Sequence, residues 1–243
     1  MNQSMNQGRG LTVILKLLLK ILPQQRHQRS QGFSLIDVLA GIVVLSAFIS
    51  LSMNALLTSA LLKNRARIVT EANNWIEQDL ELVKNQAAIV TYALASNASA
   101  GTNQITLVNN YGLASGEQIS IAGDSTIYTI QSVSGNVINL TDPLYFAANQ
   151  GSVVSPISKC KATASGLGLA TALRASLPAV TNSGTRRFSN KTFTLSRTTT
   201  VGTNAPFQVL NVAYTVAQSG ASTPVARMYT EVIPTAAFQC PSA

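Results

Sequence analysis

The chain has 243 residues, of which 46% are hydrophobic and 11% are charged, and its formal net charge is +8 at pH 7. Soluble domains carry about 25% charged residues and disordered chains are poor in hydrophobic ones, so this composition excludes an intrinsically disordered chain and a coiled-coil rod. Five of the 17 basic residues lie within the first 32 residues, which contain no acid, so the charge gives little support for a nucleic-acid-binding surface on the folded part.

Residues 1–32 form a basic, polar leader with its own apolar-basic stretch at 11–22. Lys16 and Lys20 share one face of a helix there, because they are four residues apart. Two interpretations stay open. The stretch lies on the inner surface of a membrane, or the start codon is misassigned.

Residues 33–62 form a continuous apolar run whose single charge is Asp37. About 20 apolar residues suffice for a helix to cross a bilayer, so this run predicts a transmembrane helix. Arg26 and Arg29 precede the run on the side that should stay cytoplasmic. The basic residues that follow the run weaken this charge contrast: Lys63, Arg65 and Arg67.

Plainer explanations of the apolar run leave features of it unexplained. A secretory signal has a short apolar region that ends in small residues, and this run is too long for one. An ordinary signal anchor or transmembrane helix does not account for Asp37, because an ionisable group inside a membrane is costly and usually functional.

The junction between leader and apolar run carries a motif, Gly32-Phe33-Ser34-Leu35-Ile36-Asp37-Val38-Leu39. This motif resembles the processing site of class III signal peptides in type IV prepilins and type II secretion pseudopilins. The family pattern has Gly, then Phe or Met, an acid at the fifth position after the Gly, and a long apolar helix. The long leader and the Asp in place of the usual Glu depart from that pattern. The resemblance extends from Gln31 to about Ala95 and is architectural beyond.

The resemblance implies a role for each residue of the junction. Prepilin peptidase would cut between Gly32 and Phe33, and Phe33 would then be N-methylated. Asp37 would pair with the amine of Phe33 on a neighbouring pilin subunit during assembly on an inner-membrane platform. The chain would cross the inner membrane once, with its head in the periplasm, before it enters a pilus on the cell surface.

Residues 63–95 contain no glycine or proline and continue the helix with an amphipathic pattern. Apolar residues recur at helical spacing, at Ile68, Ala72, Trp75 or Ile76, Asp79 or Leu80, Val83, Ala87 and Val90. The resemblance to pilins implies one helix over 33–95, of which one half is embedded and the other packs on a head. We expect Trp75 to pack against the sheet of that head.

Residues 96–155 predict a small all-β unit of short alternating strands at 104–110, 117–123, 126–133 and 136–142. The unit resembles small β modules of phage tail and surface proteins. Residues 156–243 predict a short helix at 162–177 and three strands at 191–201, 207–216 and 225–233. The expected fold class is therefore α+β, with a long N-terminal helix packed on an antiparallel β head and an additional small all-β unit.

The two cysteines, Cys160 and Cys240, bracket the C-terminal region. Cysteines in an exported domain usually pair, so we expect a disulfide, and two buried free thiols are the alternative. The position resembles the C-terminal disulfide loop of many pilins. The cysteines are too far apart in sequence for a clustered zinc site.

The leading hypothesis is a structural subunit, most like a minor pilin, and a type II secretion pseudopilin is an alternative. An enzyme is not expected, because the only histidine is His27 in the leader and no metal or cofactor motif appears. A membrane-anchored surface-binding module is a further alternative. Aromatic residues are candidates for glycan binding or for ordinary packing: Tyr111, Tyr128, Tyr145 and Phe146. Basic residues are candidates for DNA contacts or for solvation: Lys159, Lys161, Arg186 and Arg187.

Overall fold

A computed structural model describes residues 35–241 of the chain. The described residues divide into two units, one up to Ala60 and one from Leu61 onward. Helix α2 (Leu35–Ile89) begins in the first unit and continues into the second. We call the second unit the head. The leader, including Gly32 and Phe33, lies outside the described residues.

Helix α2 ends at Ile89, earlier than the predicted end at Ala95. From Val90 onward the buried side chains alternate, with Val90, Tyr92 and Leu94 all inside the core. This period of two belongs to an extended chain, which β-branched and aromatic residues favour. The extended segment makes an antiparallel bridge from Ala93 to Val153, so the chain enters and leaves the following β unit at neighbouring points.

The unit at residues 96–155, called the β module here, is a five-stranded antiparallel sheet in the order β1-β4-β3-β2-β5. The four predicted strands are confirmed as β1 (Gln104–Thr106), β2 (Gln118–Ile121), β3 (Ile127–Ser134) and β4 (Val137–Leu140). Alternate residues such as Ile119, Ile130 and Ile138 fill its core. Strand β5 (Val154–Ser155) was not predicted, because two residues are too few to display an alternating pattern.

The helix predicted at 162–177 is only partly correct. The structure has a short helix α3 (Ile157–Cys160) and, after a turn, helix α4 (Leu169–Ser176). Gly168 precedes α4 with an extended backbone, and a Cβ at this position would collide with the carbonyl oxygen of Phe207. This close approach of two chain segments fixes the start of α4, and single-sequence periodicity does not register it.

The remaining strands form an antiparallel sheet in the order β6-β7-β8-β9. Three of them confirm the predicted meander: β7 (Lys191–Val201) has the predicted ends, and β8 (Leu210–Gln218) and β9 (Pro224–Val232) have shifted ends. Strand β6 (Thr185–Phe188) was not predicted, because only Phe188 of its four residues is buried and no alternation results. Two short 3-10 helices complete the head, η1 (Thr181–Gly184) and η2 (Thr235–Gln239).

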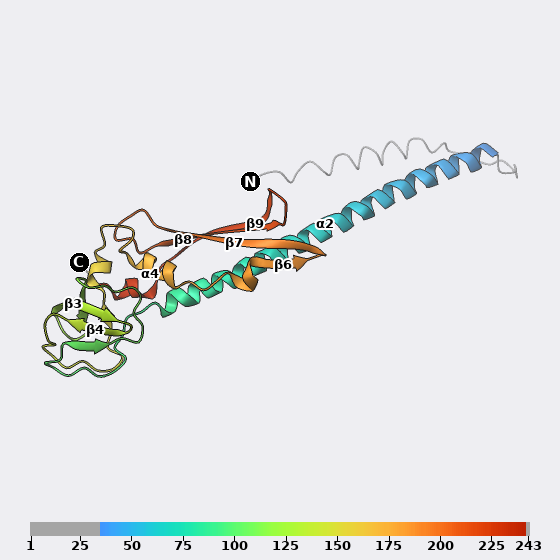
Figure 1. Cartoon of the computed structure of the whole chain (residues 1–243). Coiled ribbons are helices and arrows are strands. Elements are labelled where there is room, and N and C mark those ends of the chain that lie inside the picture. Colours follow the sequence, from blue (N-terminus) through green and yellow to red (C-terminus); the bar gives the residue numbers. More distant parts are fainter. Residues whose placement is uncertain (1–34, 242–243) are drawn as a thin grey trace, which may run out of the picture. The chain divides into compact units, whose positions relative to one another are not determined.

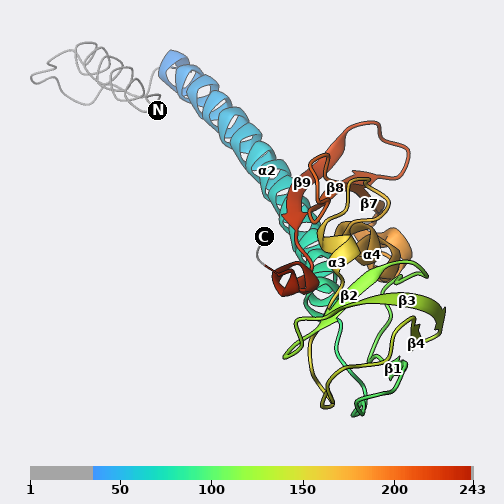
Figure 2. The ribbon, with the colours of Figure 1, turned by 90° about the vertical axis from the view of Figure 1, so that its left-hand side faces the viewer.

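One hydrophobic core joins the head part of α2 to both sheets. Trp75 of α2 is fully buried and meets the ring of Phe188 edge-on at 5.8 Å, and Phe188 stacks on Phe193 at 5.0 Å. The expected packing of Trp75 against the sheet is therefore confirmed. Strands β6–β9 run along α2, and the β module follows the end of that helix (Figure 1). Figure 2 shows α3 and α4 between the module and the four-stranded sheet. The predicted α+β fold class is confirmed.

Candidate functional site

The apolar segment of α2 is not covered by other described parts of the chain. Its large side chains are mostly more than half exposed, as at Leu35, Ile36, Leu39, Ile42, Phe48, Leu51, Leu56, Leu61 and Leu62. Among the described residues, α2 is the helix long and apolar enough to cross a membrane, and it lies near the N-terminus. So large an apolar surface requires lipid or other protein around it.

Three hydroxyl side chains within this segment have internal partners. The hydroxyls of Ser46 and Ser50 donate to the carbonyl oxygens of Val43 and Ser46, both at 2.9 Å, and Thr58 donates to Asn54 at 2.8 Å. Hydroxyls bonded to the preceding turn expose little unsatisfied polarity to lipid. The carboxylate of Asp37 is thus the chemically exceptional group of the segment.

Asp37 lies in the first turn of the described part of α2. The positive end of the helix dipole favours a carboxylate at this place. Within residues 35–241 the side chain has no ion-pair partner, and it is exposed. The predicted cleavage and methylation sites, Gly32 and Phe33, lie outside the described residues, so their predicted roles stay predictions.

A buried ion pair fastens the head part of α2 to the sheet. Asp79 of α2 is 0% exposed, and its Oδ2 accepts a hydrogen bond from Nη1 of Arg197 in β7 at 2.8 Å. The other carboxylate oxygen accepts the backbone N–H of Thr181 at 2.8 Å. Trp75, one turn earlier, donates from Nε1 to the Thr181 hydroxyl at 3.0 Å. The helix, β7 and η1 are therefore joined around one carboxylate.

Helical spacing alone places either Asp79 or Leu80 on the buried stripe of α2, and no sequence motif marks Arg197. A usable signal was present. Arg197 continues the inward-facing alternation of Phe193 and Leu195 along the strand. A charge on the buried face of a helix and an opposite charge on the buried face of a strand each cost free energy when unpaired, so the two are expected to pair.

Burial, together with the nearby charge of Asp79, raises the pKa of the Tyr214 hydroxyl.

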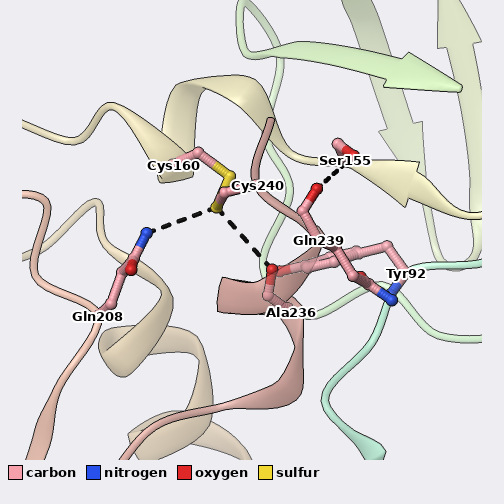
Figure 3. Close-up of a disulfide and its surroundings, with 7 residues drawn as sticks. All are labelled: Tyr92, Ser155, Cys160, Gln208, Ala236, Gln239 and Cys240. Carbon is pink, nitrogen blue, oxygen red and sulfur yellow. Dashed lines mark hydrogen bonds between the residues drawn. A yellow bond between two sulfur atoms is a disulfide. The ribbon is translucent and has the colours of Figure 1, made fainter. Parts of the chain in front are cut away.

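Cys160 and Cys240 form a disulfide with an S–S distance of 2.01 Å and Cα atoms 5.5 Å apart, so the predicted pairing is confirmed (Figure 3). The bond ties the end of α3 to the residue after η2. The same C-terminal segment is held by hydrogen bonds, from the Ser155 hydroxyl to the Gln239 carbonyl at 2.6 Å and from the Ala236 N–H to Val90 at 2.9 Å. The C-terminal segment thus closes the head against the end of α2.

The four basic residues proposed for DNA do not act as one group. The side chain of Lys159 is 7% exposed, and its Nζ lies 3.1 Å from Oε1 of Glu117, which links α3 to the β module. Lys159 is therefore a structural residue. Lys161, Arg186 and Arg187 are exposed, with Lys161 at the end of α3 and the two arginines side by side in β6.

The four aromatic residues proposed for glycan binding fall into two sets. Tyr128 is buried, and Tyr111 is only partly exposed, with its hydroxyl bonded to the carbonyl of Ile89 at 3.0 Å. Tyr145 and Phe146 are 69% and 63% exposed. A pocket of about 230 Å³ opens beside Phe146 and is lined in part by Asp124, Asn149 and Ser152.

The loop that carries Tyr145 and Phe146 is fixed by hydrogen bonds. The N–H of Tyr145 donates to the buried Tyr128 hydroxyl at 3.0 Å, and that hydroxyl donates to Oδ2 of Asp124. This bond from Tyr128 holds the pKa of the Asp124 carboxyl below its usual value. The backbone of Leu144 accepts from Gly101 at 2.8 Å. The exposed rings therefore stand on a preorganised support.

No group of three or more His, Cys, Asp or Glu side chains in a metal-binding arrangement occurs among residues 35–241. No family model matches the chain, and no curated protein sequence matches it. A solved structure that matches in part is the Gp54 tailspike of Acinetobacter baumannii bacteriophage AP22 in complex with A. baumannii capsular saccharide. The match covers 26% of this chain and 13% of the tailspike, with 15% identity and a TM-score of 0.24, and it carries no argument about fold or function.

Proposed function

We propose that the chain is a minor pilin-like structural subunit, cleaved by a prepilin peptidase and assembled into a pilus or pseudopilus. The observation that carries the proposal is the apolar, uncovered segment of α2 with a single carboxylate in its first described turn. The Gly32-Phe33 junction directly before this segment supplies the cleavage motif of the family that the sequence resembles.

The apolar segment suits two surroundings in turn. Before assembly it lies in the inner membrane, with the head in the periplasm. During assembly it leaves the lipid and packs among the same segments of other subunits, so its apolar surface stays away from water throughout.

During this transfer from lipid to fibre, Asp37 makes the segment pack selectively against other subunits. A carboxylate in apolar surroundings needs an opposite charge, and the methylated amine of Phe33 on a neighbouring subunit provides one. The head part of α2, fastened by Asp79 and the core, keeps its fold in both states. A β module in addition to the four-stranded sheet supports a minor rather than a major role.

The experiment that tests the proposal measures how much of each Asp37 variant enters sheared surface fibres, relative to the membrane fraction. Asp37→Ala and Asp37→Asn are expected to reduce incorporation about tenfold or more, because the Phe33 amine of the neighbour loses its partner. Asp37→Glu keeps the charge and is expected to assemble nearly as wild type. The head is expected to fold equally in all variants.

Asn54→Ala is the matched control, since it removes a polar side chain from the same apolar segment without changing its charge. Gly32→Val supplies the uncut precursor for comparison, and mass spectrometry of the wild type should find Phe33 at the N-terminus. Equal incorporation of the Ala, Asn and wild-type chains would contradict the assembly role of Asp37. A wild-type N-terminus at Met1 or Met5 would contradict the family proposal itself.

A second candidate function, a surface-binding module, is favoured by the exposed pair Tyr145 and Phe146. Exposed aromatic rings on a fixed loop beside a polar pocket are typical of a recognition surface, because little entropy is lost when a ligand stacks on them. The neutral polar groups of Asn149 and Ser152 in the pocket suit the hydroxyls of a saccharide.

Binding of the full-length chain to an array of defined oligosaccharides tests this second function. Phe146→Ala is expected to weaken binding about tenfold, the usual effect of losing an aromatic anchor. Tyr229→Ala is the matched control, because Tyr229 is 63% exposed but lies on β9. Equal losses in both variants, or no binding by the wild type, would reject the candidate.

A further inference from the structure

The pocket beside Phe146 lies between two loops of the β module. One loop joins β2 to β3 and contributes Gly123 and Asp124, and the other leads from β4 to β5 and contributes Phe146, Asn149 and Ser152. The pocket volume is about 230 Å³. Sites for drug-sized ligands measure about 300–1,000 Å³, so this pocket matches a smaller unit, of the size of one sugar ring.

Backbone hydrogen bonds hold both loops in place. The N–H of Ala122 in the first loop donates to the carbonyl of Val153, at the end of the second loop, at 2.8 Å. Ala98 and Ala148 exchange two hydrogen bonds, each of 2.8 Å, which tie the second loop to the start of the module. The pocket is therefore formed before a ligand enters, and binding requires little ordering of the chain.

Asp124 gives the pocket a negative charge with acceptor capacity to spare. Its Oδ1 accepts the N–H of Thr126 at 2.8 Å, and its Oδ2 accepts the hydroxyl of Tyr128. Each carboxylate oxygen has two lone pairs, so both can accept a further hydrogen bond. The carboxylate has no ion-pair partner in the described part of the chain. Because the Tyr128 bond lowers its pKa, Asp124 stays ionised in mildly acidic as well as neutral solution.

The β module is acidic, although the chain as a whole has a net charge of +8. Residues 96–155 contain three acids, Glu117, Asp124 and Asp142, and no Lys, Arg or His. Glu117 is neutralised by Lys159, while the other two acids have no ion-pair partner among residues 35–241. The module therefore attracts cationic ligands and repels anionic ones such as uronic acids.

We propose that this pocket binds an amino sugar, with the sugar ring on Phe146 and the ammonium group on Asp124. The proposal rests on the surface-binding candidate described above and names its class of ligand. An amino sugar carries a flat C–H face for the aromatic ring, a cation for the carboxylate, and hydroxyls for Asn149 and Ser152. A lysine side chain offers the cation alone, so the remaining lining favours the saccharide.

The test compares two oligosaccharides that share a backbone and differ in the charge on nitrogen, the hexamers of glucosamine and of N-acetylglucosamine. Calorimetry with the full-length chain in detergent measures both affinities, in buffer acidic enough to protonate the sugar amine. The wild type is expected to bind the glucosamine hexamer about tenfold more tightly, because a hydrogen bond to a charged group adds that much. Asp124→Asn should remove the preference by weakening the glucosamine hexamer alone about tenfold.

Asp142→Asn is the matched control, because it removes the same charge from an exposed residue of the same module that does not line the pocket. This variant should keep the preference. Asp124→Glu retains the charge and should keep most of it. Unchanged binding of the N-acetylglucosamine hexamer to the Asp124→Asn variant would show that the pocket itself is intact.

Three results would overturn the amino-sugar proposal. The first is equal affinity of the wild type for the two hexamers, and the second is an equal loss of preference in the Asp142→Asn variant. The third is competition by trilysine as effective as that of the glucosamine hexamer, which would mean that the ammonium group alone is recognised. Each of these leaves the surface-binding candidate standing if the wild type binds a saccharide, whereas no binding to any saccharide would reject both.

Discussion

Replacing Asp79 by alanine is expected to lower the free energy of unfolding of the head by about 3–5 kcal/mol, and replacing Arg197 is expected to cost the same. Each change leaves the opposite charge buried without its partner. Loss of Asp79 also removes the acceptor of the Thr181 N–H, which would free η1 from the helix. Urea unfolding of the full chain in detergent, followed by the fluorescence of the single tryptophan, measures the effect.

Two controls separate the buried pair from charge effects in general. Arg67 pairs with Glu71 at 2.8 Å on the same helix, but its side chain is 73% exposed, so Arg67→Ala should cost less than about 0.5 kcal/mol. The double replacement of Asp79 by Leu and Arg197 by Met should cost far less than the sum of the single alanine variants, because no charge stays buried alone. Additive losses in the double variant would contradict this account.

Removing the disulfide by Cys160→Ser and Cys240→Ser is expected to destabilise the head by about 2–5 kcal/mol. The bond closes a loop of 80 residues, and the chain-entropy model assigns about 4 kcal/mol to a loop of this length. Release of η2 would also loosen the contacts of Gln239 with Ser155 and Tyr92. Urea unfolding with and without reductant measures the loss.

Reduction of the wild type provides the matched comparison for the disulfide. Reductant should lower the stability of the wild type to that of the double serine variant, and it should leave the variant unchanged. Peptide mapping without reduction should find the two cysteines in one cross-linked pair. Labelling of both thiols in the unreduced, exported protein would show that the bond does not form.

The strands that were predicted from sequence are those that carry their own alternation. Strand β7 is an example, because its residues alternate between core and surface over most of its length. Strand β6 and the early end of α2 were missed for a different reason. Strand β6 carries no alternation of its own, since only Phe188 of its four residues is buried, and the extended chain after α2 pairs with a segment distant in sequence, as Ala93 does with Val153.

The candidate sites also fall into two groups, those recognisable from local sequence and those recognisable only in the fold. Asp37 is recognisable in sequence because a carboxylate in an apolar run is conspicuous locally. The pairing of Asp79 with Arg197 spans 118 residues, and each partner alone looks like an ordinary charged residue. Lys159 was misassigned to the surface because its partner Glu117 belongs to the β module, 42 residues earlier. Local patterns show that a charge exists, and only the fold shows whether it meets an opposite charge.

The β module is one contiguous stretch of chain that begins and ends at neighbouring points. The chain enters beside Tyr92 and leaves beside Val154, whose N–H donates to the Tyr92 carbonyl at 2.9 Å. A single deletion between these points leaves the segments that form the order β6-β7-β8-β9 unchanged. Such a deletion also removes Glu117, which leaves the ammonium of Lys159 without its ion-pair partner. In a chain without the β module, an uncharged residue is therefore expected at position 159.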